Sequence, residues 1–218
     1  MDRDRRYGMA VGDEAVVTIT DMSTSGEGIG HFEGYTLFIK GAVIGDVVRV
    51  RLTMAKKTYG YAEVTETVTP SPDRVEPPCP IAGICGGCTM QAVSYPAQLR
   101  YKKAEVVNDL KRIGGLDLPV NEVIGMEKPL RYRNKAQYPV GIDRDGRIVC
   151  GFYAGRSHTI IPAEDCLISG ECDAAVIREV TAFMRERGIL EAKVKESLGN
   201  LFTTLRPTAR SLSNSWYI

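Results

Sequence analysis

The first third of the chain alternates apolar and polar residues in short runs, which is the pattern of half-buried β-strands. The runs lie in VGDEAVVTITDMS from Val11, GEGIGHFEGYTLFIKGA from Gly26 and DVVRVRLTMAKKTYGYAEVTETV from Asp46. Glycines between them supply the turns. The pattern predicts five strands over residues 7–68. Such short consecutive strands favour a small closed barrel of the oligonucleotide-binding (OB) type, because closure removes exposed strand edges.

Three of these glycines have the spacing of a nucleotide-binding loop. Gly26, Gly28 and Gly30 match the start of a dinucleotide-binding motif, but His31 stands where the next spaced glycine would be. The motif also needs a helix immediately afterwards, and the pattern here continues as strand. We therefore interpret them as hairpin and bulge glycines.

A proline-rich segment ends the β region. Residues 69–80 (TPSPDRVEPPCP) contain five prolines, which disfavour both a helix and a central strand. We predict a linker here, followed by a second domain.

The second domain, predicted over residues 81–188, has an α+β pattern. A helix should begin after Ser94, with Pro96 in its first turn and Leu99, Val106, Leu110 and Ile113 on its inward side. Two strands, RYRNKAQYPVGI from Arg131 and RIVCGFY from Arg147, should be joined by a hairpin at residues 143–146. A second helix is predicted from Asp173 to Arg187, with inward positions at Val176, Ile177, Val180, Phe183 and Met184.

Charge is balanced overall but unevenly distributed. The chain has 28 Lys and Arg against 27 Asp and Glu, yet residues 95–160 contain 12 basic and only 7 acidic side chains. This local excess indicates a surface that meets an anion, although a solvated face without a partner would have the same composition. No apolar run is long enough to span a membrane, and the first residues lack the apolar core of a signal peptide. We expect a cytoplasmic protein that does not bind membranes.

Three of the six cysteines, Cys79, Cys85 and Cys88, lie within ten residues. Gly86 and Gly87 between the last two allow the backbone to wrap closely around a bound group. An iron–sulfur cluster needs four soft thiolate ligands, and the fourth could be Cys150, Cys166 or Cys172. Spacing alone does not choose among these three.

Other readings of the cysteines remain open at this point. Zinc bound by four cysteines fits the same inventory, although only Cys85 and Cys88 form the paired knuckle typical of such sites. Buried, unligated cysteines would explain Cys150 better than the clustered three. A nucleophilic cysteine is the weakest reading, because neither His31 nor His158 lies in a recognisable catalytic setting.

Basic residues beside aromatic ones are candidates for RNA binding, because cations neutralise phosphates and aromatic rings stack on exposed bases. On a strand, alternate residues share a face, so Arg131, Arg133 and Lys135 should point the same way. The remaining candidates are Arg156 and His158 after the next strand, and Lys40, Lys56 and Lys57, with Tyr59, on the barrel.

Several motifs together resemble the amino-terminal portion of the RNA uracil-C5 methyltransferase family, and its 23S rRNA branch most closely. They are CPIAGICGGCTMQ from Cys79, SYPAQLRYKKAEVV, YRNKAQYPVG, GFYAGRSHTIIP and EDCLI. The barrel resembles the TRAM domain that opens those enzymes. The resemblance extends from Val11 to Gly188.

The resemblance implies a 4Fe-4S cluster held by Cys79, Cys85, Cys88 and Cys166, which leaves Cys150 and Cys172 as packing residues. It implies structured RNA as partner, with 23S rRNA expected and DNA not, and we expect a monomer. Family enzymes methylate a flipped-out uracil with S-adenosylmethionine (SAM), using a carboxy-terminal SAM-binding α/β domain and a nucleophilic cysteine that we do not recognise in this sequence. We therefore name no catalytic residue and expect the chain to be catalytically incomplete.

The Ser/Thr/Arg-rich segment 189–218 departs from the family pattern. We expect a truncated or aberrant tail there, from an early gene end or a reading frame lost near Lys193–Asn200. Two alternatives remain: a stand-alone iron–sulfur or zinc RNA-binding module, and a small electron-transfer protein.

Overall fold

A computed structural model describes residues 9–155 and 157–189. The chain divides into two compact units, Met1–Met126 and Glu127–Ile218, and each is described here by itself. No helix in the described ranges is long and apolar enough to cross a membrane. The domain limits drawn from the sequence, at residues 68, 80 and 188, remain predictions.

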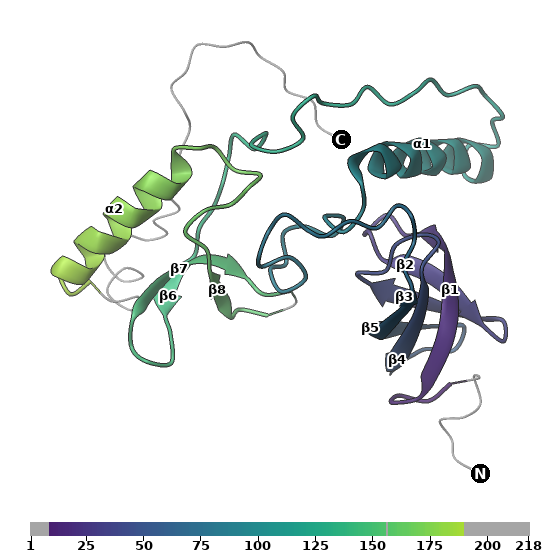
Figure 1. Ribbon diagram of the computed structural model, residues 1–218, viewed down its shortest axis with the longest axis horizontal. Helices are drawn as coiled ribbons and strands as arrows, with labels where there is room; N and C mark the ends of the chain where they lie inside the picture. The colour runs from purple at the N-terminus through teal and green to yellow at the C-terminus, as the bar shows by residue number, and fades with distance from the viewer. Residues whose placement is uncertain (1–8, 156, 190–218) are drawn as a thin grey trace. The chain divides into compact units, whose positions relative to one another are not determined.

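The first unit contains the predicted closed barrel (Figure 1). Its strands are β1 (Glu14–Met22), β2 (Gly28–Phe32), β3 (Tyr35–Lys40), β4 (Val47–Ala55) and β5 (Tyr59–Thr69). They pair in the order β1-β2-β3-β5-β4, and β4 closes the barrel against β1. Only the β3–β5 pair is parallel. The expectation of five strands closing into an OB-like barrel is confirmed.

The barrel interior is filled by the side chains that point inward from each strand. Leu37 and Ile39 on β3 and Val48 and Val50 on β4 have no exposed surface. Successive residues of a strand point to opposite faces, so the residues between them, such as Phe38 and Arg49, lie on the outside. The alternation visible in the sequence therefore separates a dry core from an outer face that is free to bind.

The proline-rich segment is held against the barrel by one buried carboxylate. Asp46 is fully buried and accepts hydrogen bonds from the backbone N–H of Val43 (2.7 Å) and Ser71 (2.8 Å). The Arg74 guanidinium donates to it at 2.5 Å. Burial acts to raise the pKa of Asp46, but these hydrogen bonds outweigh it and hold the pKa below the ordinary carboxyl value. The segment is thus tied down at Ser71 and Arg74.

Helix α1 (Tyr95–Arg112) begins after Ser94 with Pro96 in its first turn, as predicted. Its buried contact is Ala97, which packs with Val43 and Val93 in a small second core. The predicted inward side is correct only in part: Leu99 and Leu110 are half-buried, but Val106 is 48% exposed and Ile113 is 83% exposed.

The following segment returns along α1 instead of leaving it (Figure 1). The Met126 N–H donates to the Tyr95 hydroxyl at 2.8 Å, and Lys103 pairs with Glu122. The absence of a side chain at Gly125 allows the segment to lie this close to α1, because a Cβ at that position would lie 2.7 Å from the Leu99 side chain.

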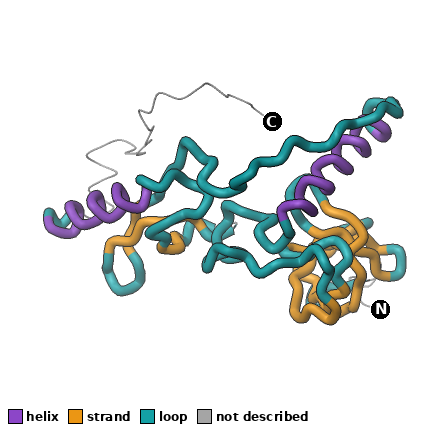
Figure 2. The backbone as a smooth tube through the Cα atoms, turned by 45° about the horizontal axis from the view of Figure 1, so that its top comes forward, coloured by secondary structure: helices purple, strands orange, loops and turns teal. Residues whose placement is uncertain are grey.

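The second unit is a small α+β structure (Figure 2). Strands β6 (Val140–Ile142), β7 (Ile148–Tyr153) and β8 (Ile160–Pro162) form an antiparallel sheet in that order, and helix α2 (Asp173–Glu186) packs against β7. The hairpin at residues 143–146 is confirmed, with Gly146 at φ +76°. On α2, Ile177 and Met184 are buried as predicted, whereas Phe183 is 53% exposed.

The long strand predicted from Arg131 is wrong. Only its last residues, Val140–Ile142, are strand, and the residues before them form a loop that makes one isolated bridge, between Arg133 and Ser169. Arg131, Arg133 and Lys135 therefore do not share a strand face.

Candidate nucleic-acid interface

The cysteine segment is a series of turns attached to the barrel. The Ala82 N–H donates to the Cys79 carbonyl at 3.0 Å, and the Cys85 N–H donates to the Ile81 carbonyl at 3.0 Å. Lys40 at the end of β3 donates from Nζ to the Gly83 carbonyl at 3.0 Å. All three clustered cysteines are half-buried, so the segment has a defined backbone beside the barrel.

The cysteine sulfurs do not form a ready ligand set. Among the residues that the structure describes, no three Cys, His, Asp or Glu side chains are gathered closely enough to hold a metal ion. The chemistry of three thiols suits iron or zinc, but their arrangement does not. Cys166 belongs to the second unit, away from the other three in the sequence.

The two remaining cysteines differ from each other. Burial raises the pKa of Cys150 to about 11, so its thiol stays protonated at neutral pH, as a packing residue would. Cys172 precedes α2 and is exposed. Its assignment as a packing residue is therefore wrong.

Arg131 holds the loop that carries Cys166. Its guanidinium donates two hydrogen bonds of 2.6 Å to the Asp165 carboxylate and one of 2.9 Å to the Cys166 carbonyl. Its backbone N–H donates to the Leu167 carbonyl at 2.9 Å, and its φ is +57°, which is uncommon outside glycine. Hydrogen bonding from Arg131 lowers the pKa of Asp165 and the same pair raises the pKa of Arg131. The geometry is that of a clamp on the Cys166 loop.

The other basic candidates of the second unit reach solvent to different degrees. Lys135 is exposed and Arg133 is half-buried. His158 is exposed and lies edge-on to Tyr153, with ring centroids 5.5 Å apart. Arg156 lies outside the described residues, as does segment 190–218. The RNA-binding role of these residues stays a prediction.

The barrel candidates lie at opposite ends of the outer face of β3 and β5, with the β4–β5 turn beside the start of β3 and Lys40 opposite Glu63 at its other end. Lys56 and Lys57 occupy the β4–β5 turn and are exposed, and Lys40 ends β3. The buried Tyr35 fixes this turn, because its hydroxyl donates to the Lys56 carbonyl at 2.7 Å and accepts from the Lys56 N–H at 3.1 Å. The turn is therefore anchored from inside the barrel.

Three aromatic rings lie together on the same outer face, and only Tyr59 was singled out from the sequence. Phe38 lies 5.6 Å from both Tyr59 and Tyr61, and these two are 5.9 Å apart, measured between ring centroids. The parallel pairing of β3 with β5, which places Phe38 opposite Tyr61, brings them together. Phe38 is one position from Leu37 in the alternation, which was the available signal for an outward ring.

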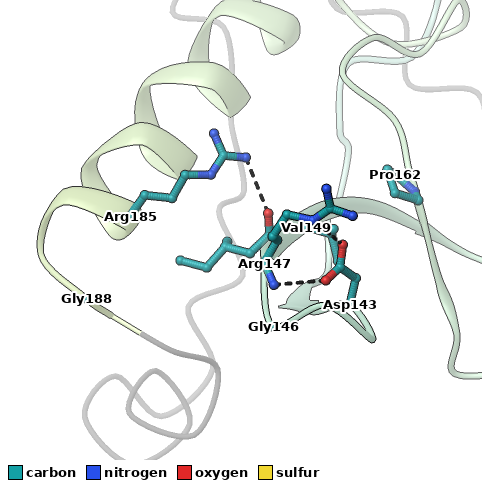
Figure 3. Close-up of a pocket in the computed structure, with 8 residues that line it drawn as sticks. Asp143, Gly146, Arg147, Val149, Pro162, Arg185 and Gly188 are labelled. Atoms are coloured by element: carbon teal, nitrogen blue, oxygen red, sulfur yellow. Dashed lines mark hydrogen bonds and ion pairs between the residues drawn. The ribbon is translucent and has the colours of Figure 1, made fainter.

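A separate cavity of about 590 Å³ lies in the second unit (Figure 3). Arg147 at its edge is paired with Asp143 at 3.1 Å, and Arg185 donates to the Ile148 carbonyl at 3.3 Å. Of the described residues that line it, none was predicted to bind RNA or metal. Both of these arginines are engaged within the protein.

Comparison with known proteins places this geometry in context. The TRAM domain family matches residues 9–65, which is the barrel. An uncharacterized RNA methyltransferase of Halalkalibacterium halodurans is 46% identical over 178 residues, covering 81% of this chain and 39% of that protein. One from Clostridium tetani is 43% identical over 183 residues, covering 84% of this chain and 40% of that protein.

This chain is a TRAM-containing homologue of RNA methyltransferases. The part of the resemblance that these matches confirm is the kinship with RNA methyltransferases. The chain spans about two-fifths of the length of these RNA methyltransferase relatives, since it covers 39% and 40% of them.

The fold of a solved RNA methyltransferase is also similar. The crystal structure of Pyrococcus abyssi tRNA (uracil-54, C5)-methyltransferase in complex with S-adenosyl-L-homocysteine matches with a TM-score of 0.52 and 24% identity. The match covers 79% of this chain and 37% of that one. At this identity it supports the fold only.

Proposed function

We propose that this chain is the RNA-recognition portion of a SAM-dependent RNA (uracil-C5) methyltransferase that acts on 23S rRNA. The observation that carries the proposal is the 46% identity to a protein named RNA methyltransferase over 178 residues, which is 81% of this chain. The cysteine motif and the motifs after it favour uracil C5 as the methylated position. Such an RNA target would place the protein in the cytoplasm.

Binding is the part of the reaction that these residues can perform. Lysines and arginines neutralise phosphates and provide most of the sequence-independent affinity for RNA. The exposed Lys135, Lys56 and Lys57 suit that role, as does Arg133 in part. Methyl transfer would require the part of the relatives that this chain does not span, so we propose that residues 1–218 alone are catalytically incomplete.

A 4Fe-4S cluster with Cys79, Cys85, Cys88 and Cys166 as ligands belongs to the same proposal. Because the sulfurs are not gathered in the described residues, cluster binding would have to draw the loop together and so be coupled to local folding. The clamp from Arg131 to the Cys166 carbonyl gives the later ligand a defined backbone before binding.

Iron analysis tests the cluster. Chain purified without oxygen should be brown and contain equal amounts of iron and acid-labile sulfide. Cys166→Ser should lose most of both, whereas Cys150→Ser, the matched control, should retain them. Zinc in place of iron in the unmodified chain would disprove the cluster.

RNA binding is tested with the full chain, a 23S rRNA fragment, a tRNA and duplex DNA of similar size. We expect the rRNA fragment to bind most tightly, with an affinity that falls linearly with salt on logarithmic axes. Lys135→Ala should reduce the salt slope by about one phosphate contact. Arg144→Ala, an equal loss of charge in the exposed hairpin turn, should leave the slope unchanged. No binding to any RNA at low salt would refute the function.

A further inference from the structure

We propose that the barrel carries a base-stacking site for unpaired RNA nucleotides, made of Phe38, Tyr59 and Tyr61 and bordered by Lys40, Lys56 and Lys57. The inference rests on the proposed function in that it takes RNA as the partner. The inference goes further by naming the surface of the first unit that contacts RNA. It also names the form of RNA that binds there and the side chains that make the contact.

The rings occupy positions that the barrel core does not need. Their neighbours in the alternation, Leu37, Gly60 and Ala62, point inward and are buried, while the three rings are half-buried on the outer face. The interior is already filled by a cluster of twelve buried residues that includes none of the three rings. The rings form a triangle with centroids 5.6 to 5.9 Å apart, so each supports its neighbours and leaves ring surface open to solvent.

The frame around the rings is rigid. Phe38 and Tyr61 are register partners across the parallel β3–β5 ladder, and Tyr59 is the partner of Thr36. The turn that precedes Tyr59 is held by the buried Tyr35 through both the carbonyl and the N–H of Lys56. A site that is already ordered loses less conformational entropy when a ligand binds.

Several charges on the outer face of the barrel are paired. Arg49 pairs with Glu66 at 3.1 Å, and Arg51 pairs with Glu14 at 3.2 Å and Glu63 at 3.8 Å. These pairs cancel much of the local field. Glu63 follows Tyr61 on the outer face of β5 and is the register partner of Lys40.

The lysines at the two ends of the ring cluster have no ion-pair partner. Within the described ranges no carboxylate forms an ion pair with Lys40, Lys56 or Lys57. Lys40 donates to a neutral carbonyl, that of Gly83, which fixes its position. Lys56 and Lys57, in the exposed turn before Tyr59, therefore supply positive charge that attracts phosphates to the rings.

Single-stranded RNA is the ligand that fits this combination. Every base has a flat face that can stack on an aromatic ring, and a neighbouring cationic groove follows the backbone. A duplex hides its base faces within the helix, so stacking on rings selects loops, bulges and ends. OB-type barrels bind oligonucleotides through the face of strands 2 and 3 and the loops beside it. Here, Phe38 lies on β3 and the lysine turn joins β4 to β5.

The test uses the full chain and a fluorescein-labelled, unstructured RNA of about 12 nucleotides, a length within the range of one OB fold. Anisotropy titrations compare this RNA with the same strand annealed to its complement. Phe38→Leu and Tyr59→Leu remove a ring and keep apolar volume. Each should weaken single-strand binding by about 5- to 150-fold, the effect of losing one stacked base, without changing the salt slope. Tyr59→Phe keeps the ring and should retain the affinity of the unmodified chain.

A second pair of variants separates the lysines from general charge. Lys56→Ala/Lys57→Ala should reduce the single-strand salt slope by about 0.7 per lysine. Arg49→Ala/Arg51→Ala removes the same charge from arginines that are already paired with glutamates and should not reduce the salt slope. RNA carrying 5-iodouridine, irradiated in the complex, should crosslink to a peptide that contains Phe38, Tyr59 or Tyr61. Circular dichroism confirms that each variant is folded.

Each outcome has a defined meaning. Leucine variants that are folded and bind like the unmodified chain would disprove the stacking site while leaving RNA binding intact. Equal affinity for duplex and single strand, or equal loss in the lysine and arginine variants, would do the same. If the unmodified chain binds neither RNA at low salt, the proposed function and the stacking site are both wrong.

Discussion

The barrel of the first unit buries twelve residues in one cluster around Leu37 and Ile39, whereas the second unit buries six apolar side chains in its described residues. Polar contacts also hold the second unit, among them the Arg131–Asp165 pair and the bond from the Tyr138 hydroxyl to Asp173 at 3.1 Å. Apolar burial stabilises in proportion to area and without direction. A hydrogen bond or ion pair needs a defined geometry, so a single substitution that removes one partner can lower stability sharply.

The largest expected effect tests the buried carboxylate at the edge of the barrel. Asp46→Ala would leave the Arg74 guanidinium and two backbone N–H groups without their partner, and breaking a buried pair in this way costs about 3–5 kcal/mol. Urea unfolding should show this loss of stability. A loss under about 1 kcal/mol would contradict the role given to this residue.

The same residue predicts a pH dependence. Its pKa is lower in the folded protein than the ordinary value of 3.8, so the unfolded chain binds a proton more readily and stability decreases as pH falls. The contribution is fully present above the ordinary carboxyl pKa and is lost as pH falls through the lower folded-state pKa. Unfolding curves of the unmodified chain and Asp46→Asn below pH 4 should therefore converge.

A direct test of the comparison truncates one core residue in each unit. Leu37→Ala in the barrel and Ile177→Ala on α2 each remove buried side-chain atoms, at a cost of about 2–5 kcal/mol. We expect Leu37→Ala near the top of that range, because a closed barrel cannot collapse around a cavity, and Ile177→Ala near the bottom. Equal losses would mean that the two units are packed alike.

A smaller and local effect is expected at the Cys166 loop. Arg131→Lys keeps the charge but loses the two-pronged contact with Asp165. Amide hydrogen exchange should become faster for residues 165–169 and stay unchanged in the barrel. Arg147→Lys in the hairpin is the matched control and should leave residues 165–169 unaffected. Faster exchange across the whole chain would show that Arg131 supports more than this loop.

The smallest effect is expected at Arg51 on the outer face of the barrel. Arg51→Ala removes exposed ion pairs with Glu14 and Glu63, and because such pairs contribute about 0–1 kcal/mol each, the midpoint of thermal unfolding should barely move. A large shift would show that surface charges, and not the core, limit the stability of the barrel.

The sequence predicted correctly those strands and turns that are determined by residues adjacent in the chain. The alternation around Val48 and Val50 predicts a strand, and Asp143 with Gly146 predicts a hairpin, because neighbouring residues decide both. The predicted strand from Arg131 failed because its contacts are with Asp165 and Leu167, more than thirty residues later. No period in the sequence encodes such a loop.

The candidate site was predicted unevenly for the same reason. The lysines of the β4–β5 turn stand out in the sequence, but the ring triangle depends on β3 pairing in parallel with β5. The residues next to Phe38 in the sequence do not predict that Tyr61 lies beside it in the fold. The inward face of α1 was predicted only in part, because the segment that covers Tyr95 and Leu99 is the chain that ends at Met126, and no local period predicts that contact.

Tyr35 contributes to the structure in two ways. Its ring packs in the barrel core, and its hydroxyl forms hydrogen bonds with the backbone of Lys56 in the β4–β5 turn. A substitution at this position must meet two requirements, because the new side chain has to fill the barrel core and also place an oxygen next to the backbone of Lys56. Phenylalanine would meet the first demand and fail the second. The carbonyl and N–H of Lys56 would then lose the hydroxyl that positions them.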